Sequence, residues 1–563
     1  MFNLFKKGKT DPKIYPEEIF MDSENVSEFD VHQFEGRLEK AINKKTFLYF
    51  SVALGVIAAF FLIKLFHLQI LKGEQFSQRS EENSLKKEIL APLRGVIYDK
   101  NKVKLAWNGE NGRVYAQPAG LSHVLGYIGL PSKDDFQEKG DIFAEAIIGK
   151  SGVEKKYEDF LKGEAGIKLI EVSSQNDIVS ESVQKPPKNG KNLDLTIDSR
   201  VQSQFFRLME LIAKERDFKG GAGIILDAED GDVLSMISWP EYDSQILSEG
   251  SPTEKIDSFI KNKNKPFVNR AVAGLYPPGS IIKPLIALAA LNEGIISPQK
   301  EIFSAGSISI PNPFFEDKKS VFRDWRAHGW VDMRRALAVS SDVYFYEVGG
   351  GFEDIKGLGI NKIKEYAGIF GFDKETGIDI SGELHGVIPS PELKSKNDPD
   401  DPIWRIGDTY NTSIGQGYFL VTPIQITAYA ATIANSGQII RPRVVNNLVQ
   451  EGDGEQNIQN QKVEIPESYF KIIKEGMRMA VTEGTAQGLS MPNVKIAAKT
   501  GTAEAGNKYT HSWVMGFFPY ENPKYVFTVV LEKGPAGNLV GALALMRQLL
   551  DWMTINTPEY FAD

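Results

Sequence analysis

The sequence predicts an α/β (α+β) protein with one N-terminal membrane-spanning helix, a mostly β segment after it and a larger C-terminal domain. Three observations predict this arrangement. An uncharged apolar run occupies 46–63, β-type runs occupy 220–239 and 494–534, and long helical patterns fill the sequence between those β-type runs. Strands early and late with helices between them are typical of a layered domain whose antiparallel sheet joins distant parts of the chain.

The composition places the chain among globular proteins and excludes several classes of function. A length of 563 residues is enough for two to four domains. Hydrophobic residues at 42% and charged residues at 25% exclude a wholly disordered, collagen-like or polytopic membrane protein. The net charge of −9 argues against nucleic-acid binding, because no basic excess is available to neutralise phosphates. The absence of cysteine excludes thiol nucleophiles, disulfides and cysteine-ligated metal sites.

The apolar run predicts a transmembrane helix over 46–66, because it reaches the roughly 20 residues that span a bilayer core. Four basic residues come before the helix, namely Arg37, Lys40, Lys44 and Lys45. The positive-inside rule therefore places 1–45 in the cytoplasm as a tail and the rest of the chain outside. The chain is accordingly predicted to be a single-pass protein of the inner (cytoplasmic) membrane.

Two other interpretations of the apolar run are weaker. A buried helix of a soluble domain usually carries a polar stripe, which this run lacks. A cleaved signal peptide lies close to the N-terminus and ends in small residues, whereas a long polar segment precedes this run and no cleavage site follows it.

Residues 67–190 are predicted to form a separate, mostly β domain. Helical spacing continues to about residue 84, and proline, glycine and an Asp-Lys-Asn turn then separate short β-type runs over 90–108. A short helix between glycines is expected within 148–166.

Residues 191–563 are predicted to form the larger domain. It begins with a strand and a helix over 191–215, followed by two β-runs around a Glu-Asp-Gly turn. Helices follow from Ala271 onward, and three β-runs and an amphipathic helix close the chain.

The first motif that suggests chemistry is Ser280-Ile-Ile-Lys283. The turn 277–279 precedes it, and Ser280 is predicted to begin a helix that ends near Gly294. Residues three apart share a helix face, so a neutral Lys283 amine could take the proton of the Ser280 hydroxyl and activate it as a nucleophile. Alone this signal is weak, because the same spacing also begins at Ser84, Ser182, Ser258 and Ser297.

Two further motifs complete a set. Ser-Ser-Asp at 340–342 could be an ordinary polar turn, and Lys-Thr-Gly-Thr at 499–502 could be an edge strand with a solvated lysine. On an inward strand face, however, the Lys-Thr-Gly-Thr motif could bind a substrate carboxylate, and Gly501 would let a ligand approach the backbone. Ser-x-x-Lys on a helix, Ser-x-Asp about 60 residues later and Lys-Thr-Gly on a late strand form the acyl-serine constellation. Its middle motif usually ends in asparagine, and Asp342 takes that place.

These motifs and the segments around them resemble the class B penicillin-binding proteins. The resemblance runs from about residue 60 to the C-terminus and is carried by LAPLRGVIYDKNKVKLAWN, IGKSGVEKKYEDFLKGEAG, LTID, YPPGSIIKP, SSDVYFY, IGQGYFLVTPIQ and AAKTGTAEA. The segment FRDWRAHGWVD and the triplet that ends in aspartate favour the elongation type over the division type, which usually has asparagine there.

The resemblance implies a penicillin-binding, or serine acyltransferase, fold in which a central antiparallel sheet lies between helical layers. Residues 67–190 would be the pedestal, a dimerisation-type domain, and 191–563 the transpeptidase domain. Such proteins are D,D-transpeptidases that cross-link the stem peptides of peptidoglycan during cell-wall elongation and are targets of β-lactams. The resemblance implies no cofactor.

The resemblance also assigns roles to individual residues. Ser280 would attack the carbonyl of the penultimate D-alanine, and Lys283 would be the base, its pKa lowered by a second lysine nearby. Ser340 would relay the proton to the leaving amine, and Asp342 would orient Lys283 or the substrate amide. Lys499 would supply positive potential.

Substrate binding is assigned to the late strand. Thr500 and Thr502 would hold the terminal carboxylate, and Gly501 between them is grouped with the substrate-binding residues. The backbone N–H groups of Ser280 and Thr502 would form the oxyanion hole, where each donor contributes about 3–4 kcal/mol in other serine enzymes.

Two departures from the family pattern concern the pedestal and a metal. Only 109–124 separate the LAWN and GYIG segments, so most of the head that elongation-type relatives carry there is missing. Some relatives bind zinc near the FRDW segment through Asp, His and Cys. Asp324 and His328 remain here, but Ser341 stands in place of the cysteine, and no metal is predicted because a closed zinc site needs about four ligands.

The predicted partners are peptidoglycan stem peptides, β-lactams, the membrane, and a SEDS-type membrane glycan polymerase with the elongation machinery. Four alternatives stay open. A β-lactam hydrolase needs a base that activates water, and a β-lactam sensor needs more membrane helices and a cytoplasmic effector. A bifunctional synthase needs a glycan-polymerase domain, and a non-catalytic protein would have lost its motifs, which are intact here.

Overall fold

A computed structural model describes residues 44–561 except 78–84, 117, 134, 137–145, 174–176, 313–314, 316, 447–460 and 507. The tail predicted over 1–45 therefore lies almost entirely outside the described residues. The chain divides into two compact units, of which one comprises 1–87 and 169–182 and the other 88–168 and 183–563.

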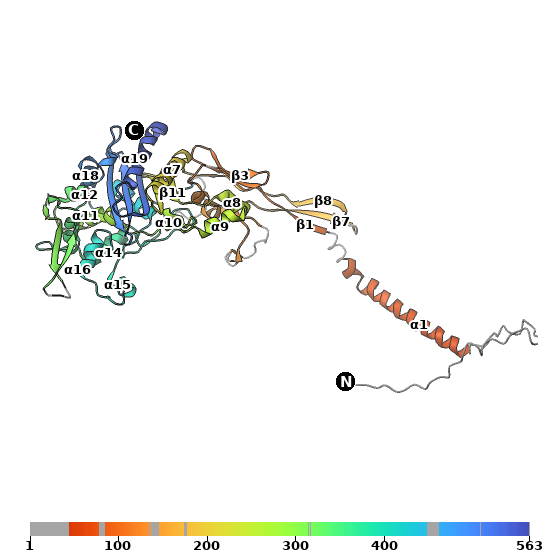
Figure 1. The fold of residues 1–563 in the computed structure, drawn as a ribbon. Helices are drawn as coiled ribbons and strands as arrows, with labels where there is room; N and C mark the ends of the chain where they lie inside the picture. Colours follow the sequence, from red (N-terminus) through yellow and green to blue (C-terminus); the bar gives the residue numbers. More distant parts are fainter. Residues whose placement is uncertain are drawn as a thin grey trace, which may run out of the picture. The chain divides into compact units, whose positions relative to one another are not determined.

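The first unit contains the apolar helix α1 (Lys44–Phe66), which continues as the π-helix η3 (His67–Leu71) (Figure 1). None of its residues is buried. Within the stretch Lys44–Leu71, an 18-residue window has a mean hydropathy of 2.3, and the stretch is long enough to cross a membrane. A helix that is apolar on every side and has no buried residue has the properties of a membrane span.

The largest sheet belongs to the second unit and has five strands. In spatial order they are β11 (Val233–Trp239), β10 (Gly220–Asp227), β18 (Tyr525–Pro535), β17 (Tyr509–Phe518) and β16 (Ala497–Glu504). All four pairings are antiparallel. Two strands from the first half of the sequence thus pair with three from its end, which confirms the predicted sheet.

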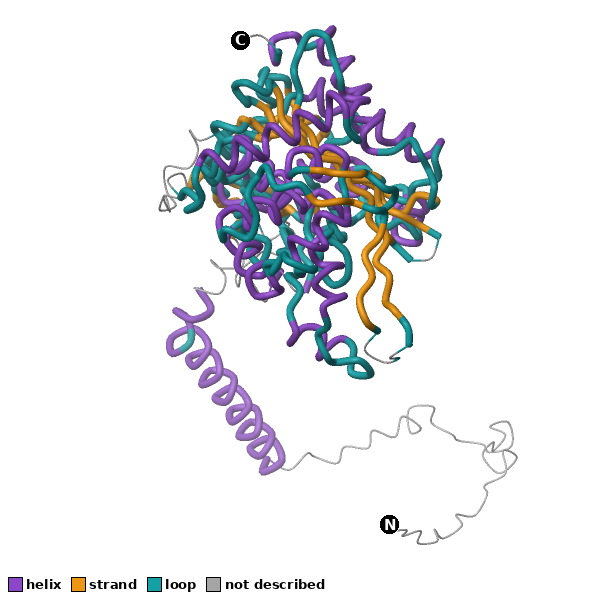
Figure 2. The backbone as a smooth tube through the Cα atoms, turned by 90° about the vertical axis from the view of Figure 1, so that its left-hand side faces the viewer, coloured by secondary structure: helices purple, strands orange, loops and turns teal. Residues whose placement is uncertain are grey.

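Each face of this sheet packs on its own apolar core. Side chains alternate along a strand, and in β10 Ile224 lies in one hydrophobic cluster while its neighbour Ile225 lies in the other. Helices α7 (Ser199–Glu215) and α19 (Ala542–Asn556) belong to the second cluster. Figures 1 and 2 show the strands enclosed by helices, as expected for a sheet between helical layers.

The core on the other face contains a helix that is apolar all round. Helix α11 (Lys283–Asn292) is buried from Lys283 to Leu291, which explains why its sequence has no polar stripe. The same core includes α17 (Pro423–Ala434), whose first turn has a proline and a Thr422 cap. The motif Ser280–Lys283 therefore lies at the N-terminal end of a tightly packed helix.

The remaining strands form small sheets. Two of them, of three and four strands, have the orders β1-β7-β8 and β4-β3-β2-β9. Their strands are β1 (Leu85–Leu90), β2 (Ile97–Tyr98), β3 (Lys104–Gly109), β4 (Gly112–Tyr115), β7 (Gly166–Val172), β8 (Ile178–Lys185) and β9 (Leu193–Asp194). Pairs are formed by β5 (Ile128–Gly129) with β6 (Ile148–Gly149), β12 (Ile302–Ser304) with β15 (Gly329–Val331), and β13 (Ser307–Pro311) with β14 (Lys319–Arg323).

The one short helix expected within 148–166 is two helices, α5 (Gly152–Lys156) and α6 (Glu158–Leu161). Other helices of the second unit are α3 (Ser122–Leu125), α8 (Ser244–Glu249), α9 (Thr253–Lys261), α10 (Arg270–Ala273), α12 (Met333–Val339), α13 (Asp342–Gly350), α14 (Gly359–Ile369), α15 (Pro391–Asn397), α16 (Ile406–Ser413) and α18 (Glu467–Glu483). Short 3-10 turns are η4 (Gly279–Ile282), η7 (Gln487–Leu489) and η8 (Pro558–Tyr560).

A buried charge network joins two of the segments that carry the family resemblance. Arg94 Nε lies 2.6 Å from Glu154 Oε2, and Arg113 Nε lies 2.8 Å from Glu154 Oε1. Arg94 also contacts Glu158 at 2.7 Å. Because every charge has a partner, the segment around Arg94 is held to α5 and α6 without leaving a charge unpaired.

Candidate active site

The turn that carries Ser280 is held by glycines and by backbone contacts. Gly279 has φ of +57°, and a Cβ atom there would lie 2.6 Å from the Thr502 carbonyl oxygen. Its N–H donates to the Gly415 carbonyl at 2.8 Å. The predicted helix is present, but its first turn is the 3-10 turn η4, and α11 begins only at Lys283. Ser280 is half-buried at this junction and remains accessible from one side.

Gly501 has a different neighbour from the one predicted. A Cβ atom at this position would lie 2.9 Å from Ile281 Cγ2 and 3.2 Å from the Pro278 carbonyl oxygen. The absence of a side chain at Gly501 therefore makes room for the turn that carries Ser280, which lies directly against β16. The predicted approach of a ligand to this backbone stays a prediction.

The amine of Lys283 is turned toward the Ser-Ser-Asp triplet. Its side chain is fully buried, and Nζ donates to Asp342 Oδ1 at 2.6 Å, to the Ser340 carbonyl at 2.8 Å and to Ser340 Oγ at 3.3 Å. These contacts agree with the predicted role of Asp342 in orienting Lys283. Ser340 has φ of +58°, an unusual conformation for a residue with a side chain, so its hydroxyl is held in place by the surrounding fold.

Lys499 reaches the same hydroxyl from the opposite side. Its Nζ donates to Ser340 Oγ and to the Thr500 carbonyl, both at 2.8 Å. The Ser340 hydroxyl thus lies between two buried lysine amines. Burial, and then the positive charge of Lys283, hold the pKa of Lys499 well below its usual value, although Asp342 opposes the shift.

A residue that the sequence did not single out contacts Thr500. The Thr500 hydroxyl donates to Thr485 Oγ1 at 2.7 Å, and the Thr485 N–H donates to the Ala338 carbonyl. Thr502, by contrast, is exposed. Thr485 follows a Thr-Glu-Gly run between a helix and a 3-10 turn, and neither its spacing nor its residue type distinguishes it from other loop threonines.

Asp324 is a second contact of the triplet that sequence reasoning did not assign to the site. Its Oδ2 accepts from Ser341 Oγ at 2.9 Å and from the Val343 N–H at 3.0 Å, so it holds the start of α13. Ser341 Oγ also donates to Ser304 Oγ at 3.0 Å. His328 Nε2 lies 3.5 Å from Asp324 Oδ1, a close approach rather than a hydrogen bond.

The prediction that no metal binds near Asp324 and His328 stays a prediction. The oxygens of Asp324 accept hydrogen bonds from the protein, whereas burial lowers the pKa of His328 and so favours the neutral imidazole, which is the form that binds metals. Within the described part of the chain, no group of three or more His, Cys, Asp or Glu side chains could hold a metal ion. In this structure Asp324 supports the triplet through its hydrogen bonds to Ser341 and Val343.

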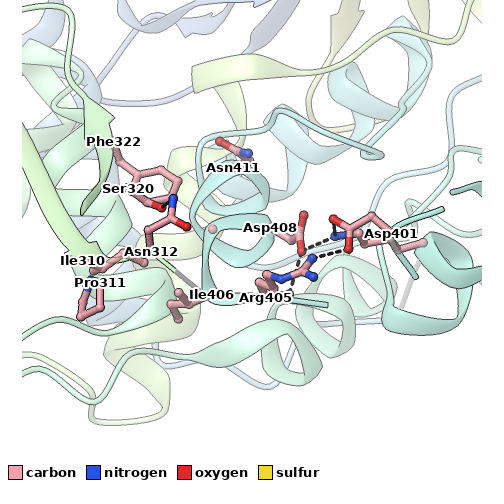
Figure 3. Close-up of a pocket in the computed structure, with 12 residues that line it drawn as sticks. Ile310, Pro311, Asn312, Ser320, Phe322, Asp401, Arg405, Ile406, Asp408 and Asn411 are labelled. Atoms are coloured by element: carbon pink, nitrogen blue, oxygen red, sulfur yellow. Dashed lines mark hydrogen bonds and ion pairs between the residues drawn. The ribbon is translucent and has the colours of Figure 1, made fainter. Parts of the chain in front are cut away.

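A cavity of about 490 Å³ lies between the β13–β14 hairpin and α16 (Figure 3). Its charged groups are paired with one another: Lys394 Nζ lies 2.8 Å from Asp408 Oδ2, and Arg405 contacts Asp401. None of the predicted site residues is among the described residues that line it, which are Ile310, Pro311, Asn312, Ser320, Phe322, Lys394, Asp401, Arg405, Ile406, Gly407, Asp408 and Asn411.

Comparison with known proteins decides the family. The model of the penicillin-binding protein transpeptidase domain matches residues 221–551, and that of the penicillin-binding protein dimerisation domain matches 110–195. The chain belongs to the penicillin-binding proteins. The resemblance that the motifs predicted is thereby confirmed, while the boundaries at 66–67 and 190–191 and the individual site residues stay predictions.

The relatives of this penicillin-binding protein include peptidoglycan D,D-transpeptidases. Peptidoglycan D,D-transpeptidase MrdA of Escherichia coli K12 is 28% identical over 611 residues, covering 90% of this chain and 92% of that protein. A complex between PBP2 and MreC from Helicobacter pylori matches with a TM-score of 0.71 and 27% identity, covering 84% of this chain and 99% of the other. A structure titled as a peptidoglycan synthase complex that coordinates polymerization and crosslinking matches with a TM-score of 0.69 and 25% identity, covering 90% and 97%.

The contact between Lys283 and Asp342 predicts a slower acylation step in an Asp342 variant of this penicillin-binding protein. The carboxylate lies 2.6 Å from the amine and holds it in place. In Asp342→Asn the first-order rate of penicillin acylation should therefore fall about 10–100-fold, because a misplaced catalytic group can cost that much. Stopped-flow acylation measures it. Asp408→Asn, beside the paired lysine of the cavity, is the control that should leave the rate unchanged. An unchanged rate in Asp342→Asn would show that this carboxylate does not position the base.

Proposed function

We propose that this penicillin-binding protein is a serine D,D-transpeptidase that cross-links peptidoglycan stem peptides during cell-wall elongation. The observation that carries the proposal is the Ser340 hydroxyl, which lies between the buried amines of Lys283 and Lys499 beside the half-exposed Ser280 turn. A path for protons between a nucleophile and a leaving amine is what transfer of an acyl group to and from serine requires.

The proposed reaction has two halves. Ser280 Oγ bonds to the carbonyl carbon of the penultimate D-alanine, its proton passes to Lys283, and the bond to the terminal D-alanine breaks. The proton reaches the leaving amine through Ser340. An amine of a neighbouring stem peptide then attacks the acyl-serine, forms the cross-link and returns a proton to Ser280. The N–H groups of Ser280 and Thr502 stabilise the oxyanion in both halves.

Substrate recognition is proposed for the β16 side of the site. Thr500 and Thr502 would hold the terminal carboxylate of the donor peptide, and Thr485 would orient the Thr500 hydroxyl, with which it shares a hydrogen bond of 2.7 Å. Lys499 would add positive potential when protonated. A β-lactam, which carries a carboxylate and a strained amide, would use the same groups and leave Ser280 acylated.

The proposed location is the inner membrane, with α1 as a single span, the N-terminus in the cytoplasm and the second unit outside. The uncharged run 46–63 within α1 and the basic residues before that run support this orientation. The proposed partners are a SEDS-type glycan polymerase and the elongation machinery. Support comes from the solved relatives, whose titles describe a complex with MreC and a peptidoglycan synthase complex.

Exchange of D-amino acids tests the proposed activity. The full chain in detergent, incubated with a pentapeptide stem and an excess of a labelled D-amino acid, should release D-alanine and incorporate the label. The signal should vanish after preincubation with penicillin or after heat denaturation. Release of D-alanine without any incorporation would indicate a hydrolytic carboxypeptidase. If D-alanine is not released and penicillin does not label the protein, the proposal of an acyl-serine enzyme is refuted.

A further inference from the structure

The indole of Trp513 contacts the turn that carries the nucleophile. Trp513 lies on β17, is 1% exposed, and its Nε1–H donates to the Pro277 carbonyl at 3.1 Å. Its ring also meets the edge of the Tyr276 ring, with centroids 6.0 Å apart. A buried indole N–H usually has one partner, and here that partner is a backbone group three residues before Ser280.

The same side chain stands opposite the Lys-Thr-Gly-Thr motif. In the β16–β17 pairing Trp513 is the partner of Gly501, between the pairs Thr500–Val514 and Thr502–Ser512. Residues that pair directly across two strands project from the same face of the sheet. The large indole therefore lies beside Gly501, and the turn that carries Ser280 contacts both Trp513 and Gly501.

The turn has few other ways to be held. Pro277 and Pro278 have no N–H, so between Tyr276 and Gly279 only carbonyl groups can bond to the rest of the protein. The backbone of Tyr276 pairs with Val421, and the Gly279 N–H bonds to Gly415. Within this segment the Trp513 indole is the donor that connects the turn to the sheet carrying Thr502.

We propose that Trp513 is a positioning residue that sets the distance between the N–H groups of Ser280 and Thr502. The inference rests on the proposed transpeptidase activity, in which these two groups form the oxyanion hole. Trp513 does not touch the substrate. It fixes the Ser280 turn to the strand that contributes the other donor, and donors of this kind act only when both lie about 2.7–3.1 Å from the developing oxyanion.

Removing the indole donor should slow the acylation step and leave ground-state binding nearly unchanged. Trp513→Phe keeps an aromatic ring but loses the N–H, and replacement by 3-benzothienylalanine keeps the shape of the indole while sulfur takes the place of the N–H. In both, the first-order acylation rate at saturating penicillin should fall about 10–100-fold, since misplacement by about 1 Å can cost that much. The apparent dissociation constant of the pre-acylation complex should change less than threefold.

Trp239→Phe is the matched control, because Trp239 is also buried but lies on β11, at the other edge of the same sheet. It should lower the melting temperature without slowing acylation. The proposal is overturned if the benzothienyl variant acylates at the wild-type rate. It is also overturned if the Trp239 and Trp513 variants lose acylation rate to the same extent for the same loss of melting temperature. Failure of wild-type protein to be acylated on Ser280 would instead overturn the proposed function, so the two failures are distinguishable.

Discussion

Replacing Ser280 with alanine is expected to abolish covalent labelling by penicillin while leaving the fold intact. The substitution removes one oxygen from a half-buried residue at the junction of η4 and α11, and none of the described hydrogen bonds depends on that oxygen. The wild-type protein should gain the mass of one penicillin, which intact-protein mass spectrometry detects, and the variant should gain none. Thermal unfolding of the two should agree within a few degrees.

The control for this experiment is a second serine with the same local spacing. Ser258 also precedes a lysine by three residues, but it lies exposed on α9, where its hydroxyl bonds only to the local Lys255 carbonyl. Ser258→Ala should label like the wild type. Peptide mapping should place the adduct on Ser280, and the adduct should persist through the assay, because no group is assigned to activate water for its hydrolysis. An adduct on another residue, or one lost within seconds, would contradict the assignment.

The sheet and the helices at the site could be predicted from the sequence because their signals are local. Short runs of β-forming residues predicted β10, β11, β16, β17 and β18. The acyl-serine motifs each occupy at most four consecutive residues. The family resemblance then supplied what spacing alone cannot, namely which of the Ser-x-x-Lys copies belongs with the other two motifs.

The supporting contacts could not be predicted, because each joins residues that are far apart in the sequence. Trp513 is 236 positions from Pro277, and Asp324 is 17 from Ser341. A lone tryptophan in a strand or a lone aspartate after one has many possible partners, and only the strand register and the packing of η4 select one. The FRDW segment, which the resemblance included, was the one signal that could have pointed to Asp324.

The approach of the Lys283 amine to Ser280 stays a prediction, whereas its contacts with Ser340 and Asp342 are present in the structure. Helical spacing predicts an amine that approaches the Ser280 hydroxyl, but the described hydrogen bonds of that amine go to Ser340 and Asp342. A carboxylate attracts a buried ammonium more strongly than a neutral hydroxyl does. Lowering of the Lys283 pKa by a second lysine stays a prediction, and the structure places such a shift on Lys499.

Replacing Lys283 with alanine is expected to lower the rate of penicillin acylation by about 10²–10⁴-fold, which is the typical contribution of a general base. Its amine bonds to the Ser340 hydroxyl, which also bonds to Lys499. The variant also leaves Asp342 without its partner, so stability should fall as well. Acylation must therefore be measured below the unfolding temperature of the variant, by stopped-flow quenching of intrinsic fluorescence.

Two comparisons separate loss of the base from loss of stability. Lys394 is also buried and paired with a carboxylate, at 2.8 Å from Asp408. It lines the cavity at α16 and is not one of the acyl-serine residues. Lys394→Ala should therefore destabilise the protein and acylate at nearly the wild-type rate. In Lys283→Ala, small alkylamines that enter the vacated space should restore part of the rate, increasingly as pH rises and more of the added amine is neutral. If Lys283→Ala acylates as fast as Lys394→Ala, the base must be another group, and Lys499 would be the next to replace.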